Sequence, residues 1–101
     1  MAAQDSNRKS ERVPFPRPIQ VRKPVAQAGK GTDIAPGGIG LDVAQAIVEG
    51  SAVELDLGDG GAPLTGTVKM ARPVDGGFRL GIQFAQDDPA IVARAQALLA
   101  K

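Results

Sequence analysis

Two groups of residues offer this chain polar side chains for binding chemistry. Residues 1–31 hold seven bases and two acids, a net charge of +5, whereas residues 32–101 hold five bases and nine acids, a net charge of −4. A basic segment ahead of a slightly acidic body is typical of a protein that meets an anionic partner, although it is also typical of a solvated tail. The second group is the stretch T-D-I-A-P-G-G-I-G at residues 32–40, where an acid stands five residues before Gly38. Taken singly, Asp33 is better explained as a residue that caps a turn, and Gly37 and Gly38 as a hairpin turn.

Catalytic and metal-binding chemistry has few candidates in this sequence. The chain contains no cysteine and no histidine, which removes thiolate chemistry, the commonest general base and the commonest metal ligand. The stretch G-K-G-T at residues 29–32 lacks the spacing of a phosphate-binding loop. The paired carboxylates Asp87 and Asp88 are explained by the start of a helix. We therefore expect a protein that is not an enzyme and that has no cofactor and no metal site.

The composition also limits the cellular compartments and the classes of partner that we expect. The 101 residues suffice for one domain with a modest core. No apolar run reaches the length of a membrane span, and the charged N-terminus lacks the apolar centre of a secretory signal, so we expect a cytoplasmic protein without membrane insertion. Three Phe residues are the only aromatic residues, too few to provide stacking platforms for single-stranded nucleic acid. A small barrel that binds RNA or DNA through its basic arm remains a weaker alternative.

Apolar residues alternate with polar ones through most of the chain, a pattern that predicts strands with one buried face. The predicted strands cover residues 19–23, 27–34, 39–43, 53–57, 64–70 and 78–84. In the fifth of these, the alternation places Met70 on the same face as Val68. Asp75 and Gly76 form a hairpin signal between the last two strands.

The period changes near the end of the chain and predicts one helix. Its apolar face would consist of Ile91, Val92, Ala95, Leu98 and Leu99. Asp88 would cap this helix, and Pro89 would occupy its first turn.

These elements predict a mainly β fold, a six-stranded antiparallel barrel with a C-terminal α-helix. Closure removes the exposed edges that six short strands would otherwise leave, and the helix would cover an opening or one side. The predicted division is a flexible basic segment at residues 1–12 followed by the barrel and helix at residues 13–101.

Two motifs in this order resemble the PilZ family. Arg8 and Arg12 form R-x-x-x-R, followed by V-P, and about twenty residues later D-I-A-P-G-G at residues 33–38 has the form (D/N)-x-(S/A)-x-x-G. The continuation G-I-G-L, the late strand G-I-Q-F and the final helix extend the resemblance over roughly residues 8–100. The resemblance implies the same six-stranded barrel and helix.

The resemblance also implies a ligand, the bacterial second messenger cyclic di-GMP. The implied ligand-binding residues are Arg8, Lys9, Arg12, Asp33, Ala35, Gly37 and Gly38. Arginine forks match phosphate oxygens and the O6/N7 edge of guanine, and a carboxylate can accept from guanine N1–H and N2–H₂. Glycine lets the backbone turn tightly and approach a ligand without a Cβ collision.

The resemblance has two departures and leaves one alternative open. Ala35 stands where serine is commoner, which removes one hydroxyl worth about 1 kcal/mol of binding. Lys69 stands near the place where many relatives have a tryptophan or another residue that stacks on a base. The implied function is a small receptor that passes the cyclic di-GMP signal to an unidentified effector protein. The alternative is a PilZ-type adaptor that binds protein partners without nucleotide.

Overall fold

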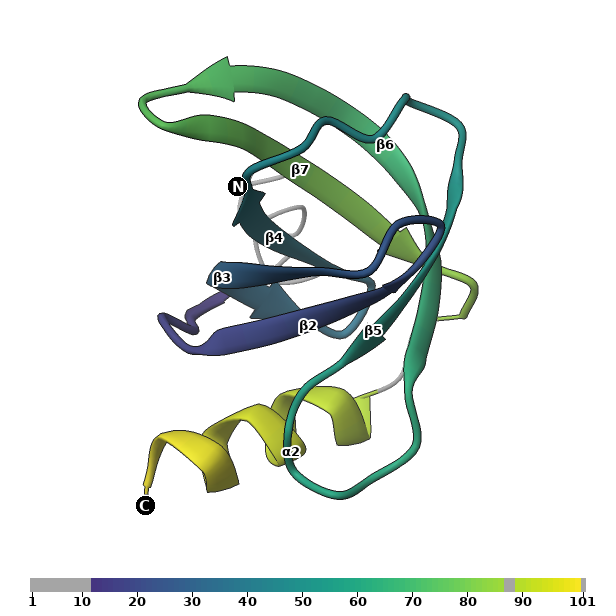
Figure 1. Cartoon of the computed structure of the whole chain (residues 1–101). Helices are drawn as coiled ribbons and strands as arrows, with labels where there is room; N and C mark the ends of the chain where they lie inside the picture. The colour runs from purple at the N-terminus through teal and green to yellow at the C-terminus, as the bar shows by residue number, and fades with distance from the viewer. Residues whose placement is uncertain (1–11, 87–88, 101) are drawn as a thin grey trace, which may run out of the picture.

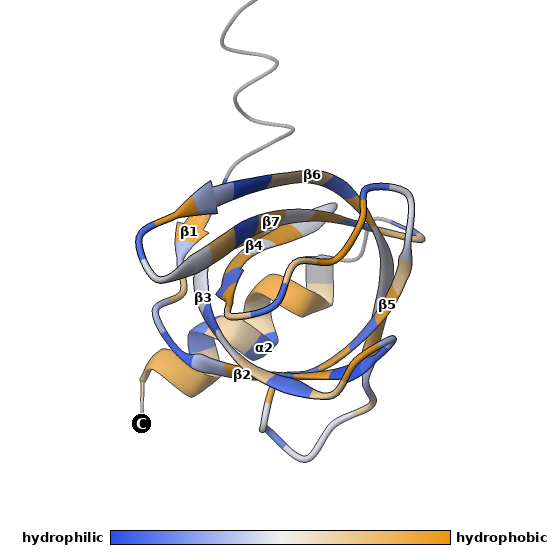
Figure 2. Cartoon of the chain, turned by 45° about the horizontal axis from the view of Figure 1, so that its top comes forward, coloured by the Kyte–Doolittle hydropathy of each residue, from blue (hydrophilic) through white to orange (hydrophobic). Residues whose placement is uncertain are grey.

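The computed structural model describes residues 12–86 and 89–100 of the chain. Its main feature is a closed antiparallel barrel, as the sequence predicts. Figure 2 looks into the ring of strands and shows the helix behind it. The ring follows the order β3-β2-β5-β6-β7-β4, and pairing of β4 with β3 closes it. The six strands are β2 (Pro18–Lys23), β3 (Gln27–Ala35), β4 (Gly38–Val43), β5 (Ala52–Asp56), β6 (Leu64–Val74) and β7 (Gly77–Phe84).

An additional short strand, β1 (Val13–Pro14), lies outside the six-stranded ring and was not predicted from the sequence. It pairs antiparallel with the end of β3, Val13 opposite Ile34 and Pro14 opposite Asp33. The prolines around it prevent a helix and favour this extended path. As a consequence, Arg12, the residue directly before β1, lies close to the end of β3.

The core fills the inside of the barrel with aliphatic side chains and two phenylalanines. Alternation in the strands delivers these residues to one face, because successive strand residues point to opposite sides of the sheet. The largest fully buried side chains are Phe15, Ile19, Ile34, Ile39, Leu41, Leu55, Leu80, Val21 and Val68. No polar or charged side chain is buried among the described residues.

Two β-bulges interrupt the alternation in β3 and β6, the strands that flank the central pair β4 and β7. One shifts the register of β3 between Gly31 and Asp33, and the other shifts β6 between Val68 and Met70. An extra residue in a strand reverses the facing of the side chains that follow it. Met70 therefore lies opposite Gly81, on the outer face of the barrel, and the predicted placement of Met70 on the inner face with Val68 is wrong.

The hairpin between β6 and β7 confirms the Asp75-Gly76 turn. The last pair of the two strands is Val74 with Gly77, and Gly76 has a φ of 80°, a conformation that favours glycine. β6 continues to Val74, beyond the predicted end at residue 70. This extension forms, with β7, the hairpin arm at the upper left of Figure 1.

Helix α2 (Pro89–Leu99) lies across one end of the barrel (Figure 1). Ile91, Ala95 and Leu98 pack into the core along one helical face, as predicted. Leu99 is 39% exposed, so its predicted place on that face is wrong. The expected cap Asp88 lies outside the described residues, as does Asp87. No helix within residues 12–86 and 89–100 has the length and hydrophobicity that a membrane span requires.

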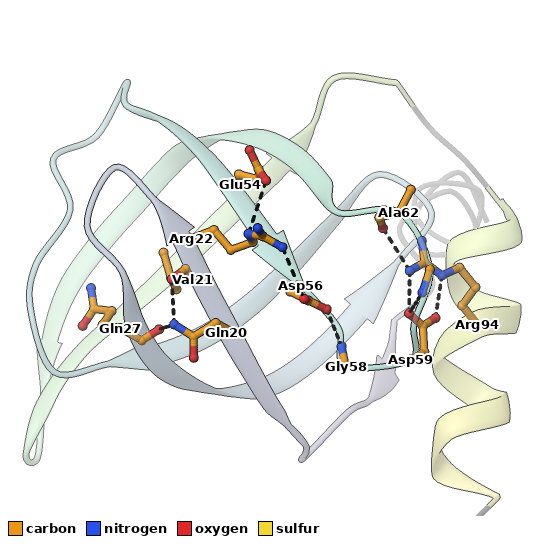
Figure 3. A network of polar contacts seen from close by, with 11 residues as sticks. Gln20, Val21, Arg22, Gln27, Glu54, Asp56, Gly58, Asp59, Ala62 and Arg94 are labelled. Carbon is orange, nitrogen blue, oxygen red and sulfur yellow. Dashed lines mark hydrogen bonds and ion pairs between the residues drawn. The ribbon is translucent and has the colours of Figure 1, made fainter.

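An ion pair fastens α2 to the loop between β5 and β6 (Figure 3). Arg94 donates from Nε and Nη2 to the two carboxylate oxygens of Asp59, at 2.7 and 2.8 Å, and from Nη2 to the Ala62 carbonyl at 3.1 Å. Asp59 also accepts from the backbone N–H of Gly61 at 2.9 Å. The hydrogen bond from Arg94 holds the pKa of Asp59 far below its usual range. This carboxylate is therefore ionised throughout the neutral and mildly acidic range.

Candidate functional site

Arg12 and Asp33, one from each predicted motif, meet directly on the outside of the barrel. Arg12 Nε donates to Asp33 Oδ2 at 2.9 Å, and Arg12 Nη2 donates to Asp33 Oδ1 at 3.1 Å. The pair is open to solvent, with side-chain exposures of 41% for Arg12 and 37% for Asp33. The pairing of β1 with β3 explains this meeting, because it carries residue 12 alongside the strand that bears Asp33.

The backbone around Asp33 is shaped to hold its carboxylate in this place. The bulge at Thr32 turns Asp33 to the outer face, opposite Gly40 of β4. A Cβ atom at Gly40 would lie 2.7 Å from Asp33 Oδ1 and 2.6 Å from Thr32 Oγ1, closer than such contacts occur. Gly40 therefore leaves the space that the Asp33 side chain occupies, a requirement that the sequence did not reveal.

A cleft of about 340 Å³ adjoins this ion pair. Four of the seven predicted ligand-binding residues line it, namely Arg12, Ala35, Gly37 and Gly38. Lys69, Gly81, Ile82 and Gln83 complete the lining. Lys69, the extra residue of the β6 bulge, brings a second cation to the cleft. It stands near the position at which the family resemblance implies a residue that stacks on a base.

Gly38 has a structural reason besides ligand approach, and Gly37 contributes a backbone hydrogen bond beside it. Neither has a positive φ. A Cβ at Gly38 would collide with the Ile82 carbonyl of β7, and the Gly37 carbonyl accepts from the Phe84 N–H at 2.9 Å. The turn between β3 and β4 is therefore pressed against β7, and this contact forms one wall of the cleft.

A second cleft, of about 470 Å³, continues from the first, since Arg12 and Gly81 line both. Asp33 and Met70 stand in its lining, together with two arginines that the sequence analysis did not single out, Arg72 and Arg79. The position of Arg79 could have been predicted from the sequence. It alternates with buried residues of β7, so it lies on the outer face together with Gly81 and Gln83. The bulge in β6 hid the corresponding signal for Arg72 and Met70.

Arg79 repeats the geometry of Arg12 one step further along the sheet. Its Nε and Nη2 donate to Asp42 Oδ1 and Oδ2 at 2.8 and 3.1 Å. These hydrogen bonds lower the pKa of Asp42 and raise that of Arg79. Both groups therefore stay charged at neutral pH, and the guanidinium is fixed in orientation.

Two of the predicted site residues, Arg8 and Lys9, lie outside the described residues, as does the rest of the predicted flexible segment except Arg12. A further cavity of about 480 Å³ lies near the start of α2. No charged residue is among those that line it, which are Pro63, Leu64, Thr65, Phe84, Ala85, Gln86 and Ile91. This cavity therefore lacks the charged side chains that line the two clefts beside Arg12.

Comparison with known proteins gives one family. Residues 6–101 match the sequence model of the family described as PilZ domain. The match includes both motifs and the whole barrel with its helix. No curated protein matches the chain.

Proposed function

The chain belongs to the PilZ domain family, and on this basis we propose that it is a non-catalytic receptor for cyclic di-GMP that passes the signal to a partner protein. Domains of this family are generally cyclic di-GMP-binding receptors. The observation that carries the proposal for this chain is the direct contact between its two motifs. Arg12 and Asp33, 21 residues apart, form a bidentate pair beside a cleft that Ala35, Gly37 and Gly38 of the second motif line.

Arg12 retains donors for a ligand while it is held by Asp33. A guanidinium carries five N–H donors, and the ion pair engages Nε and Nη2. The Nη1 edge remains for a phosphate or for the O6/N7 edge of guanine. Because Asp33 fixes the orientation of the guanidinium beforehand, less side-chain entropy is lost when the ligand binds.

Asp33 can also contact the base itself. Each carboxylate oxygen has two lone-pair sites, so an oxygen bonded to Arg12 can accept a second hydrogen bond. Guanine presents N1–H and N2–H₂ on one edge, whereas adenine has an acceptor at N1. The proposed role of Asp33 is thus double: it positions Arg12 and favours guanine.

The test is titration calorimetry of the full chain with cyclic di-GMP, in wild type and in Arg8→Ala and Arg12→Ala variants. We expect binding by the wild type and a loss of tenfold or more in each variant, because charge-assisted hydrogen bonds contribute about 1.5–3 kcal/mol. Arg22→Ala is the matched control, because Arg22 is an exposed arginine on β2 that pairs with Glu54 at 3.5 Å and does not line the clefts.

The outcomes separate the receptor from its alternative. Wild-type affinity in Arg12→Ala, with unchanged thermal unfolding, would reject the site. No heat of binding in the wild type would favour the adaptor that recognises proteins without nucleotide. In a receptor of this kind, the segment of residues 1–12 would bring Arg8 and Lys9 to the ligand. The receptor would act in the cytoplasm, where the messenger acts.

A further inference from the structure

The outer face of β3, β4, β7 and β6 forms a groove that extends beyond the two motifs. Four residues lie in one row across these strands: Asp33, Gly40, Gly81 and Met70 pair successively. The two central residues are glycines, so the floor of the groove is backbone. Met70 forms one wall, because a Cβ at Gly81 would lie 3.5 Å from the Met70 Cβ. A planar group could therefore lie flat between Met70 and Asp33.

The next row carries two arginines at the far end of this groove. Arg72 of β6 lies directly opposite Arg79 of β7 in the antiparallel register, and both line the 470 Å³ cleft. Like charges in directly opposite positions destabilise a sheet. Asp42 offsets the charge of Arg79 through its bidentate contact. Arg72 is exposed, and its side chain has no ion pair or hydrogen bond with any residue of the described part of the chain.

These arginines present donors toward the groove. Arg79 uses Nε and Nη2 for Asp42, so its Nη1 edge remains, while all five donors of Arg72 remain with respect to the described residues. Arg72 has no carboxylate partner among the described residues, whereas Asp42 holds Arg79 in a fixed orientation. Two such neighbouring arginines are suited to bind an anion with several acceptor oxygens.

We propose that Arg72 and Arg79 form a second anion-binding subsite, which takes a second phosphate of a ligand whose first phosphate is held by Arg12. The chemical class that fits is a dinucleotide with two phosphates and planar bases, one base lying on the floor of Gly40 and Gly81 against Met70. This subsite rests on the proposed function and deepens it. It assigns binding to the β6–β7 hairpin, outside both sequence motifs.

The experiment compares the affinity of cyclic di-GMP for wild type, Arg72→Ala and Arg72→Lys by titration calorimetry at several salt concentrations. Arg22→Ala is the matched control, because it removes the same charge from β2, on the opposite side of the ring from β7. Arg72→Ala should bind about tenfold more weakly than wild type, and Arg72→Lys should lose less because it keeps the charge. Salt should weaken binding less steeply in Arg72→Ala than in wild type, because the variant lacks one charge–charge contact on which screening acts.

Each outcome supports or overturns the subsite. Wild-type affinity in Arg72→Ala overturns it while leaving the proposed ligand in place, and no binding by the wild type overturns the ligand and the subsite together. A weakened Arg72→Ala with an unchanged salt slope, or an equal loss in Arg22→Ala, rejects the phosphate contact. Thermal unfolding of Arg72→Ala should match the wild type, because its side chain is exposed and makes no contact within the described residues that folding requires.

Discussion

The pairs Arg12–Asp33 and Arg94–Asp59 share one geometry in two different surroundings. In both, Nε and Nη2 of an arginine donate to the two oxygens of an aspartate, within 2.7 to 3.1 Å. In both, a glycine without a Cβ leaves room for one of the two paired side chains. A Cβ at Gly61 would lie 2.7 Å from Arg94 Nη2, just as a Cβ at Gly40 would crowd Asp33.

What differs is how completely each pair is satisfied by the protein. Arg94 and Asp59 are 25% and 16% exposed, and backbone groups of Ala62 and Gly61 complete their hydrogen bonds. Arg12 and Asp33 are 41% and 37% exposed and stand at the edge of two clefts. The same chemistry thus fastens a helix where the fold covers it, and leaves donors for a ligand where the fold stays open. Exposed ion pairs contribute little stability, so the open pair is suited to binding.

The largest expected effect on stability comes from removing the covered pair. Asp59→Ala should lower the free energy of unfolding by about 2 kcal/mol, because it removes charge-assisted hydrogen bonds and leaves Arg94 without its carboxylate. The melting temperature should fall by about 10 °C. Chemical denaturation and thermal unfolding measure these changes, and cyclic di-GMP affinity below the transition should stay at the wild-type value.

Asp56→Ala is the matched control for this variant. Asp56 also accepts from a backbone N–H two residues ahead, Gly58 at 2.8 Å, but its contact with Arg22 is long, at 3.6 Å. We expect a loss of about 1 kcal/mol or less. Equal losses in Asp56→Ala and Asp59→Ala would show that the turn, and not the ion pair with α2, stabilises the fold.

Acid should weaken the covered pair in a defined direction. The pKa of Asp59 is lowered from an ordinary value of 3.8, mainly by the hydrogen bond from Arg94. A carboxyl with a depressed pKa in the folded state stabilises the fold fully above its ordinary pKa, and that contribution is lost as pH falls below it. The stability difference between wild type and Asp59→Asn should therefore shrink from about pH 5 to about pH 2. A constant difference over that range would contradict the assignment.

The open pair should show the opposite balance of effects. Arg12→Ala should reduce cyclic di-GMP affinity at least tenfold, while changing the free energy of unfolding by less than about 1 kcal/mol. Calorimetry and denaturant unfolding on the same preparation give both values. A large loss of stability in this variant would mean that the Arg12–Asp33 pair stabilises the attachment of β1 to the barrel. The proposed difference in role between this pair and Arg94–Asp59 would then be rejected.

Base preference should depend on the carboxylate of the open pair. Both cyclic di-GMP and cyclic di-AMP carry two phosphates, so arginines alone would hardly separate them. Asp33→Ala should bind cyclic di-GMP more weakly and discriminate less, because a carboxylate that faces N1 and C2 of adenine finds no donor there. Both ligands are measured at one salt concentration. Equal wild-type affinities would mean that only phosphates are recognised.

The smallest expected effect concerns the cleft wall. Ala35 lines the 340 Å³ cleft next to Arg12, and Ala35→Ser would restore the hydroxyl that is commoner in this family. One neutral hydrogen bond contributes about 1 kcal/mol, which corresponds to about fivefold tighter binding of cyclic di-GMP. Thr65→Ala, a change of one hydroxyl on the wall of the cavity near α2, should leave affinity unchanged. No gain from Ala35→Ser would place the ligand away from this wall.

The sequence alone determined the barrel, the helix and the motif residues on the β3–β4 hairpin. Period-two alternation reports which strand face is apolar, and that information is local, so six strands and a helical face at Ile91, Ala95 and Leu98 could be predicted. The order and spacing of the two motifs likewise exist in the linear chain. The resemblance they support is confirmed by the family match over residues 6–101.

Only the tertiary structure decided which residues surround the clefts. Bulges at Thr32 and Lys69 reverse side-chain facing, and a bulge depends on the partner strand's register, which alternation within one strand does not contain. For this reason Met70 was placed on the wrong face and Arg72 was missed. The pairing of Arg12 with Asp33 and the space at Gly40 likewise arise from contacts between strands. Such contacts depend on closure of the whole barrel, and no single stretch of sequence records them.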